Sequence, residues 1–444
     1  MVVTKGKFLI IILAIVLATN LTESQEFPSN TNGKNNEVVP PNQGSSSGGI
    51  LNLLLTPIKA TYNGAKKLFG YPVNEAVDFA IDSVDEIRLQ TFRLFMKAYN
   101  KSYDSPAELK RRMNIFFERR KMIEQSVRDY AAGVISYIMR ENAFTDRTDE
   151  ELKALTRSSP PSEQEMTDDE REAILLGQYQ PGDLDNELVV HSSISGVYND
   201  DEDERNMTVM APEPIPDRKD WRESGCVAPP MDQQACGACY AIATTNTIES
   251  MRCIFSRDSS PLLSPQQVID CSTPRAGYQN HGCDGGWPTR VLKYLQDVGV
   301  VTRDACYPFV RRQDYCQLRK VRAMQGCTLN ASPTDTRLRY KILNNERDIL
   351  YHVARTGPVI TVMKALDSFL FYSRGIYDER RCSRNRDDVD HAIAIVGYGS
   401  ENGKDYWIIK NSWGTEDWGE GGFGRYRRGT RTCSLGGWGW AITS

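Results

Sequence analysis

No cysteine occurs among the first 225 residues of this 444-residue chain, and all eleven cysteines lie at or beyond Cys226. Disulfide bonds within the first half of the chain are therefore excluded. Histidine is scarce as well, with four residues in total. Apart from the lone Cys236-Gly-Ala-Cys239 string, the chain has no paired Cys-x-x-Cys sets accompanied by histidines, so we expect neither a metal site nor another cofactor.

Long apolar runs are absent beyond the N-terminus. There, Lys5 and Lys7 precede an apolar run of 11 residues from Phe8 to Ala18. Because about 20 residues are needed to span a bilayer, this run is too short and is typical of a secretory signal peptide, here residues 1–22. A retained anchor is the alternative. We expect a secretory-pathway protein with a lysosomal or extracellular destination and no stable membrane insertion.

Three segments of different composition follow before residue 211. Residues 23–49 are rich in Asn, Pro, Ser and Gly and are predicted to be disordered. Within residues 50–155, apolar positions at helical spacing predict two helices between Ser83 and Val127, joined near residues 100–106, with Ser83 and Glu86 as a capping box. Residues 156–210 contain prolines and acidic clusters and are predicted to be an exposed linker, where proteolysis concentrates.

Charge is divided unevenly along the chain. Positions 211–444 hold 31 Lys and Arg against 26 Asp and Glu, a net charge of +5, and the overall net charge of −4 leaves −9 for positions 1–210. Opposite charges on two parts of one chain favour an electrostatic attachment that weakens as carboxylates become protonated. A solvated acidic linker is the alternative explanation.

A candidate nucleophile stands in residues 233–240, which read Gln-Gln-Ala-Cys-Gly-Ala-Cys-Tyr. Cys239 precedes a predicted helix at Tyr240–Phe255, and the positive N-terminal end of a helix favours a thiolate, the form that attacks carbonyl groups. An imidazolium would favour the thiolate further. His391 stands in the strand-like run 389–399, whereas the other histidines lie in the linker, before Gly282 and in a predicted helix: His191, His281 and His352.

These motifs resemble the active site of papain-like (cathepsin-type) cysteine proteases. The resemblance implies Cys239 as nucleophile, His391 as its ion-pair partner and general acid, and Asn411 as the residue that orients the imidazole. It also implies that Gln233 donates to the oxyanion and that Trp413 covers the His391–Asn411 hydrogen bond. Taken singly, each residue has a structural alternative, such as a half-cystine, a core histidine or a turn residue.

The resemblance implies an α+β, two-lobed papain-like fold for residues 211–444, with a helical lobe carrying Cys239 and a sheet-rich lobe carrying His391 and Asn411. Three residues depart from the family's usual pattern around the nucleophile: Gln234, Ala235 and Tyr240. Gln234 stands where glycine is usual, and glycine permits backbone geometry that glutamine adopts less readily.

The acidic part of the chain before the basic domain, residues 1–210, is called the leader below. The leader resembles the inhibitory propeptide of cathepsin L-type zymogens. The similarity rests on Glu108, Arg112, Phe116 and Ile123 and on the motif 142–146. The match is incomplete, because Arg119, Val127 and Arg140 replace residues that are usual in the family. The resemblance implies that residues 50–155 act as an intramolecular inhibitor.

The odd number of cysteines leaves one thiol unpaired, and sequence alone does not determine the connectivity of the other ten. The resemblance implies that Cys239 stays free and that the others form five bridges: Cys236–Cys283, Cys271–Cys316, Cys382–Cys433, Cys226–Cys253 and Cys306–Cys327. Asn-x-Ser/Thr triplets at Asn100, Asn206 and Asn330 are possible glycosylation acceptors.

Candidate substrate-binding residues follow from the same resemblance. Gly285 and Gly286 would present backbone groups to an extended peptide. The main specificity pocket, expected to be apolar, would be lined by Trp287, Val362, Ala392 and Trp438. Core packing is the alternative for each of these residues.

The function predicted is a cysteine endopeptidase made as a zymogen, which hydrolyses polypeptides through an acyl-enzyme and is a monomer after activation, without nucleic-acid partners. An exopeptidase of the same fold is one alternative, but residues 306–327 contain no histidine for the capping loop that such enzymes use. A non-catalytic binding protein on the protease fold is the other, although such proteins usually lose the nucleophile.

Overall fold

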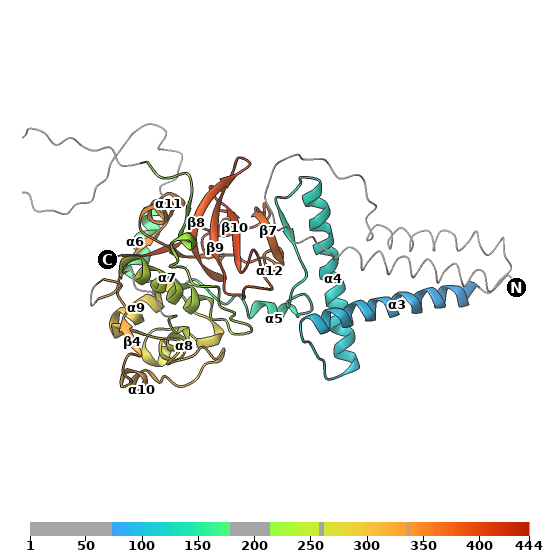
Figure 1. Cartoon of the computed structure of the whole chain (residues 1–444), viewed down its shortest axis with the longest axis horizontal. Coiled ribbons are helices and arrows are strands. Elements are labelled where there is room, and N and C mark those ends of the chain that lie inside the picture. The colour runs from blue at the N-terminus through green and yellow to red at the C-terminus, as the bar shows by residue number, and fades with distance from the viewer. Residues whose placement is uncertain (1–72, 178–213, 257–261, 335–336, 444) are drawn as a thin grey trace, which may run out of the picture. The chain divides into compact units, whose positions relative to one another are not determined.

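The computed structural model describes residues 73–177, 214–256, 262–334 and 337–443 (Figure 1). The predicted signal peptide and the segment 23–49 lie outside the described residues. The chain divides into two compact units, one up to Glu124 and one from Gln125 onward, which are described separately below.

The first unit holds α3 (Val73–Ala98) and most of α4 (Pro106–Ala131), the two helices predicted in the leader. Phe92, Phe95 and Phe116 form its core, with the rings of Phe95 and Phe116 centred 4.6 Å apart. The predicted start at Ser83 is wrong. Helix α3 already begins at Val73, so Ser83 is a helix-interior residue and the capping box with Glu86 is not the helix start.

A mixed sheet forms one half of the second unit. Its strand order is β1-β7-β10-β9-β8-β6-β11-β5, with β2 paired to β8, and a separate pair joins β3 to β4. The bounds are β1 Tyr137–Met139, β2 Lys219–Asp220, β3 Val300–Thr302, β4 Thr328–Asn330, β5 Arg339–Leu343, β6 Val359–Met363, β7 Tyr372–Tyr377, β8 His391–Glu401, β9 Lys404–Lys410, β10 Phe423–Arg427 and β11 Gly439–Thr443.

Helices form the other half of this unit, with α7, α8 and α9 gathered beside the sheet (Figure 1). The bounds are α5 Asp149–Lys153, α6 Asp168–Gly177, α7 Cys239–Ser256, α8 Pro265–Cys271, α9 Pro288–Val298, α10 Leu318–Arg322, α11 Glu346–Arg355 and α12 Asp367–Leu370, with short 3-10 turns at Trp221–Ser224, Pro274–Ala276, Gly282–Asp284 and Thr432–Ser434. The two-lobed α+β fold expected from the sequence is confirmed.

Two buried elements bring the lobes together. Helix α7 is buried along its length from Cys239 to Met251, and it lies against β8 and α9. Strand β8 is buried from His391 to Gly399 and pairs with β6 and β9. Because α7 is buried on all its faces over this stretch, it is a core helix, although it also carries polar side chains.

The leader contributes structure to the second unit. Strand β1 pairs with the sheet edge at β7, Tyr137 opposite Gly375. A side chain at Gly375 would meet the Ser136 carbonyl oxygen at 2.4 Å, so glycine allows this close approach. None of the helices in the described residues is both long and apolar enough to cross a membrane.

The prediction of an exposed linker over residues 156–210 is wrong for its first part. Ser158, Pro161 and Glu170 are buried, and α6 begins at Asp168. The Thr167 hydroxyl accepts from the Glu170 N–H, while the Glu170 carboxylate accepts from the Thr167 N–H at 2.9 Å, which is a capping box. Residues 178–210 lie outside the described residues.

Candidate active site

The start of helix α7 positions the candidate nucleophile. Cys239 is its first residue and is the free cysteine of the structure, fully buried. The loop before it is tied to the next segment by the Cys236–Cys283 disulfide and by a 2.8 Å hydrogen bond from the Gly237 N–H to the Cys283 carbonyl oxygen. A side chain at Gly237 would approach that oxygen to 2.7 Å, so the loop requires glycine there.

All ten other cysteines form disulfides. The pairs are Cys226–Cys253, Cys236–Cys283, Cys271–Cys316, Cys306–Cys327 and Cys382–Cys433. They match the pairs that the resemblance implies. The odd cysteine count thus corresponds to one buried thiol, Cys239.

The imidazole of His391 is held by two neighbours. Its Nε2 lies 2.8 Å from the Asn411 Oδ1, and its ring stacks on Trp413 with centroids 4.6 Å apart and an interplanar angle of 21°. His391 opens β8 and Asn411 directly follows β9, the neighbouring strand. The Nδ1 atom is buried without a hydrogen-bond partner among the described residues, so it is the nitrogen available to the thiol.

Gln233 is buried beside this pair. Its Nε2 donates to the Cys236 carbonyl oxygen at 2.8 Å and to the Leu155 carbonyl oxygen at 3.1 Å. Its Oε1 accepts from the Ser412 hydroxyl at 2.5 Å, next to Asn411. The Ser412 contact places the amide oxygen of Gln233 toward Ser412, so the amide N–H groups point toward Cys236 and the leader.

Residues 155–158 of the leader lie against the nucleophile and the glycine loop. The Gly286 N–H donates to the Arg157 carbonyl oxygen at 3.3 Å, and the Ser158 N–H donates to the Asp390 carbonyl oxygen at 2.8 Å. The Ser158 hydroxyl donates to the Gly286 carbonyl oxygen at 3.0 Å, and Arg157 pairs with Asp284. The first two contacts are main-chain hydrogen bonds of the kind by which an extended peptide binds, and the last two involve side chains.

Burial determines the protonation of the site. Burial raises the pKa of the Cys239 thiol to about 11, although backbone N–H groups of Ala392, Arg157 and Tyr240 act in the opposite direction. Burial lowers the pKa of His391 to about 4, against the effect of the Asn411 hydrogen bond. Both groups are therefore neutral at neutral pH with the leader in place, since desolvation disfavours each charged form.

Gln234 adopts a backbone conformation that glycine adopts more readily than other residues, at a position where glycine is usual in the family. Its φ is +50°, in the left-handed region, and its N–H donates to the Asp232 carboxylate at 3.0 Å. A side chain in this region costs roughly 1 kcal/mol relative to glycine. The departure from the family's pattern is thus accommodated at a conformational cost, and the exposed side chain meets no crowding.

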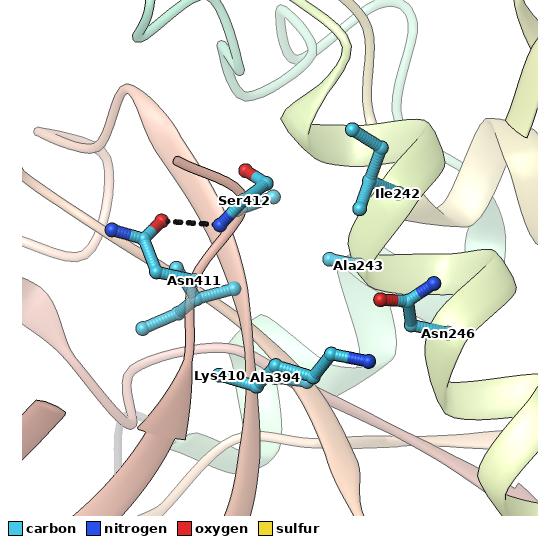
Figure 2. A pocket seen from close by; sticks show the side chains of 9 residues that line it. Ile242, Ala243, Asn246, Ala394, Lys410, Asn411 and Ser412 are labelled. Atoms are coloured by element: carbon cyan, nitrogen blue, oxygen red, sulfur yellow. Dashed lines mark hydrogen bonds between the residues drawn. The ribbon is translucent and has the colours of Figure 1, made fainter. Parts of the chain in front are cut away.

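A small pocket lies between helix α7 and strands β8 and β9 (Figure 2). Helix α7 contributes Ile242, Ala243 and Asn246, and the sheet lobe contributes Lys410 and Asn411 among others. Lys410 Nζ is buried without a hydrogen-bond partner in the part of the chain that the structure describes.

Lys410 is electrostatically coupled to a buried carboxyl of α7. Burial lowers the pKa of Lys410 to about 8, and Glu249 acts in the opposite direction. Burial also raises the pKa of Glu249 to about 7, while Lys410 acts to lower it. The pair therefore links the nucleophile helix to the strand that ends beside Asn411.

The predicted substrate-binding residues divide into two groups. Gly285 and Gly286 lie under the leader: a Cβ at Gly285 would stand 1.9 Å from the Arg157 carbonyl oxygen, so only glycine allows this approach. Val362 and Ala392 are buried neighbours on β6 and β8, and Trp287 and Trp438 pack edge to face with centroids 6.0 Å apart.

Sequence reasoning missed two leader residues that contact the site. Ser158 binds the Gly286 carbonyl, and the Glu170 Oε1 accepts from the Trp287 indole N–H at 2.8 Å. The Thr167-x-x-Glu170 pattern could have indicated Glu170, because a capping box predicts the start of a helix within the segment that was predicted to be a linker. No comparable local pattern marks Ser158.

Comparisons with known proteins agree with this geometry. Residues 215–438 match the papain family cysteine protease domain, and residues 92–152 match the cathepsin propeptide inhibitor domain. A cathepsin L-like proteinase of Phaedon cochleariae is 33% identical over 345 residues, covering 77% of this chain and 89% of the relative. Cathepsin K of Mus musculus is 30% identical, covering 80% and 93%.

Solved structures show the same likeness. Digestive procathepsin L 3 of the Tenebrio molitor larval midgut superposes with a TM-score of 0.60 at 28% identity, covering 80% of this chain and 99% of that one. The recombinant stem bromelain precursor gives a TM-score of 0.59 at 26% identity, covering 80% and 98%.

Proposed function

Because the chain belongs to the papain family of cysteine proteases and carries a cathepsin-type inhibitor domain, we propose that Cys239, His391, Asn411 and Gln233 perform its catalysis. The protein is a hydrolase made as a zymogen. The proposal concerns which residues act and how the leader holds them inactive.

Catalysis begins when the leader leaves the cleft. Cys239 then loses the burial that raises its pKa, its proton passes to Nδ1 of His391, and a thiolate–imidazolium pair forms. The thiolate sulfur bonds to the substrate carbonyl carbon, and the carbonyl oxygen becomes an oxyanion. Gln233 Nε2 and the Cys239 backbone N–H donate to this oxyanion.

The imidazolium then protonates the leaving amine as the carbon–nitrogen bond breaks, which leaves a thioester on Cys239. Neutral His391 next removes a proton from water, the hydroxide adds to the thioester, and the acid product departs with the thiol restored. Asn411 keeps Nδ1 directed at the sulfur through its bond to Nε2, and Trp413 shields that bond from water.

One observation carries the choice of endopeptidase over exopeptidase. The leader passes through the site as a continuous chain, with Leu155 on the Gln233 amide and Ser158 on Gly286 and Asp390. A polypeptide therefore extends on both sides of Cys239, as an endopeptidase substrate must. An exopeptidase would cap one side of the cleft, and residues 306–327 instead form α10 and a turn closed by the Cys306–Cys327 disulfide.

Acidification is the proposed trigger for release. Arg157 pairs with Asp284 and Arg290 with Glu165, so carboxylates join the leader to the enzyme. The pKa of Glu165 is lowered, first by a hydrogen bond from the Ser162 backbone. Its main causes lie within the leader, and only the smaller contribution of Arg290 belongs to the docking contact. That contribution favours the docked form above the ordinary pKa of about 4.5 and is weakened as the pH falls below it.

We further propose residues 1–22 as signal peptide, 156–210 as the segment cut during activation and 211–444 as the mature, monomeric peptidase, in a lysosomal or extracellular setting. Purified precursor would be treated with a thiol-directed peptide epoxide before and after incubation at about pH 4.5. The expected result is labelling of Cys239 only after acid treatment, together with a shortened chain. Absence of labelling in both states would refute the catalytic assignment and favour a non-catalytic binding protein.

A further inference from the structure

Three tryptophans form an aromatic wall next to the glycine loop. Trp287 packs edge to face on Trp438 and on Trp440, with centroid distances of 6.0 Å and 5.3 Å, while Trp438 and Trp440 are parallel. Trp287 directly follows Gly286, whose backbone binds the leader. All three rings are fully buried in the precursor, and the wall adjoins the segment that binds the leader.

The wall and the neighbouring Arg386 carry hydrogen-bond donors that have no acceptor among the described residues. The guanidinium of Arg386 lies 3.9 Å from the Trp438 ring centroid. Arg386 Nε and Nη2 and Trp438 Nε1 are all buried without a hydrogen-bond partner among the described residues. A buried donor without an acceptor is unfavourable, and a buried unpaired charge is more so.

Burial lowers the pKa of Arg386, whereas the charge of Asp387 acts in the opposite direction. The Arg386 Cβ lies close to Gly437, where an added Cβ would meet it at 3.3 Å. Arg386 thus lies beside Trp438 without an ion-pair partner among the described residues.

The indole N–H of Trp287 is a further donor of the wall, and its acceptor belongs to the leader. The Trp287 indole N–H donates to the Glu170 Oε1 at 2.8 Å, and Glu170 is 1% exposed. The acceptor in the precursor is therefore a carboxylate. When residues up to 210 are removed, this donor also loses its partner.

We propose that Trp287 and Trp438 of the wall, together with Arg386, recognise an acidic side chain, so that the mature protease prefers peptides with glutamate or aspartate at the position facing them. The proposal rests on the proposed function and adds its substrate class. A carboxylate accepts several hydrogen bonds and neutralises the guanidinium, whereas a leucine leaves every donor unpaired and a lysine adds a like charge.

The test uses acid-activated enzyme and fluorogenic peptides that differ only in the second residue before the scissile bond: Glu, Gln, Leu or Lys. A second set varies the third residue. Active enzyme is counted by epoxide titration of Cys239. We expect kcat/KM for the Glu peptide to exceed that for the Leu peptide by about 10- to 100-fold in one of the two sets, the usual effect of a hydrogen bond to a charged group.

Two variants and a matched control locate the effect. Arg386→Gln is expected to reduce the Glu-to-Leu ratio at least about 10-fold, and Trp287→Phe, which keeps the ring but loses the N–H, is expected to reduce it less. Arg384→Gln removes the same charge from an exposed neighbour and should leave the ratio unchanged.

Equal or faster cleavage of the Leu peptides in both sets, or equal ratios for the two arginine variants, would overturn the pocket assignment while the protease assignment stands. Titratable Cys239 with hydrolysis of none of the peptides would also overturn it. Failure of Cys239 to titrate at all would instead refute the proposed function, and the pocket assignment with it.

Discussion

The side-chain amide of Gln233 donates to the main-chain carbonyl oxygen of Leu155 at 3.1 Å, so the leader occupies the donor that we propose for the oxyanion. Burial raises the pKa of Cys239 to about 11, although the Arg157 backbone of the same leader segment acts in the opposite direction. The leader thus contacts both the proposed oxyanion donor and the proposed nucleophile.

Replacement of the oxyanion donor is expected to slow chemistry and not binding. For activated enzyme, Gln233→Ala should lower kcat by about 10²- to 10³-fold with a small change in KM, because the donor acts mainly on the developing charge. Steady-state kinetics normalised by Cys239 titration measure this. The neighbouring exposed Gln234→Ala is the control, and a similar loss in both variants would contradict the assignment.

The reactivity of Cys239 should depend on the leader. In the precursor, the raised pKa predicts slow alkylation at pH 7 and acceleration only toward pH 11. After activation, reactivity should extend to acidic pH, because the exposed sulfur pairs with the His391 imidazolium. Iodoacetamide alkylation, followed by mass spectrometry for a single adduct, checks both profiles. Identical profiles before and after activation would show that the leader does not control the thiol.

The Glu170–Trp287 contact should stabilise the docked leader. Glu170→Ala removes both the hydrogen bond to the indole and the cap of α6, so we expect faster acid processing, by about 5- to 10-fold for a loss near 1 kcal/mol. Electrophoresis of the precursor over time at fixed pH measures the rate. Glu172→Ala, which replaces an exposed residue of the same helix, serves as control. An unchanged rate for Glu170→Ala would mean that α6 plays no part in latency.

The buried Glu249 should make stability pH-dependent. Because its pKa is raised to about 7 from the ordinary 4.5, the folded state holds this proton more tightly than the unfolded state. The contribution of Glu249 to stability is therefore complete below pH 4.5 and is lost as the pH rises through 7.

Glu249→Gln should remove this contribution, because an amide does not titrate. His352 and His391, whose pKa values are lowered by burial to about 4, act in the opposite direction in the parent and in the variant alike, so the difference between the two slopes reports Glu249. The measurement is denaturant unfolding of the Cys239→Ala precursor between pH 4.5 and 7.5, and the exposed Glu416→Gln should retain the slope of the parent. Equal slopes for the parent and Glu249→Gln would disprove the assignment.

The left-handed backbone at Gln234 offers a stabilising substitution. Gln234→Gly should raise the free energy of unfolding by about 0.5–1 kcal/mol, since glycine adopts a positive φ without a steric cost. Gln234→Ala keeps the Cβ and should give no gain. Chemical denaturation of both variants is the test, and destabilisation by glycine would show that the Gln234 side chain contributes more than its backbone costs.

Local sequence was sufficient for much of the site. Cys239 opens its helix, His391 opens a strand and Asn411 directly follows the next one, because each lies in or beside an apolar run whose period and boundaries are visible in the residues themselves. The prediction of a helix start at Ser83 was wrong for a related reason. A capping pattern also occurs inside longer helices, and nothing in the local sequence prevents the helix from beginning further upstream, at Val73.

The chain's order of residues determined the chemical groups: one unpaired thiol among eleven cysteines, an imidazole, an amide donor and an acidic leader before a basic domain. Only the tertiary structure decided their state. Cys239 and His391 are neutral because the folded chain removes them from water, and a pKa depends on desolvation by whatever packs nearby, including residues distant in sequence. For the same reason, Arg386 and Trp287 became recognisable as donors only when their surroundings were known.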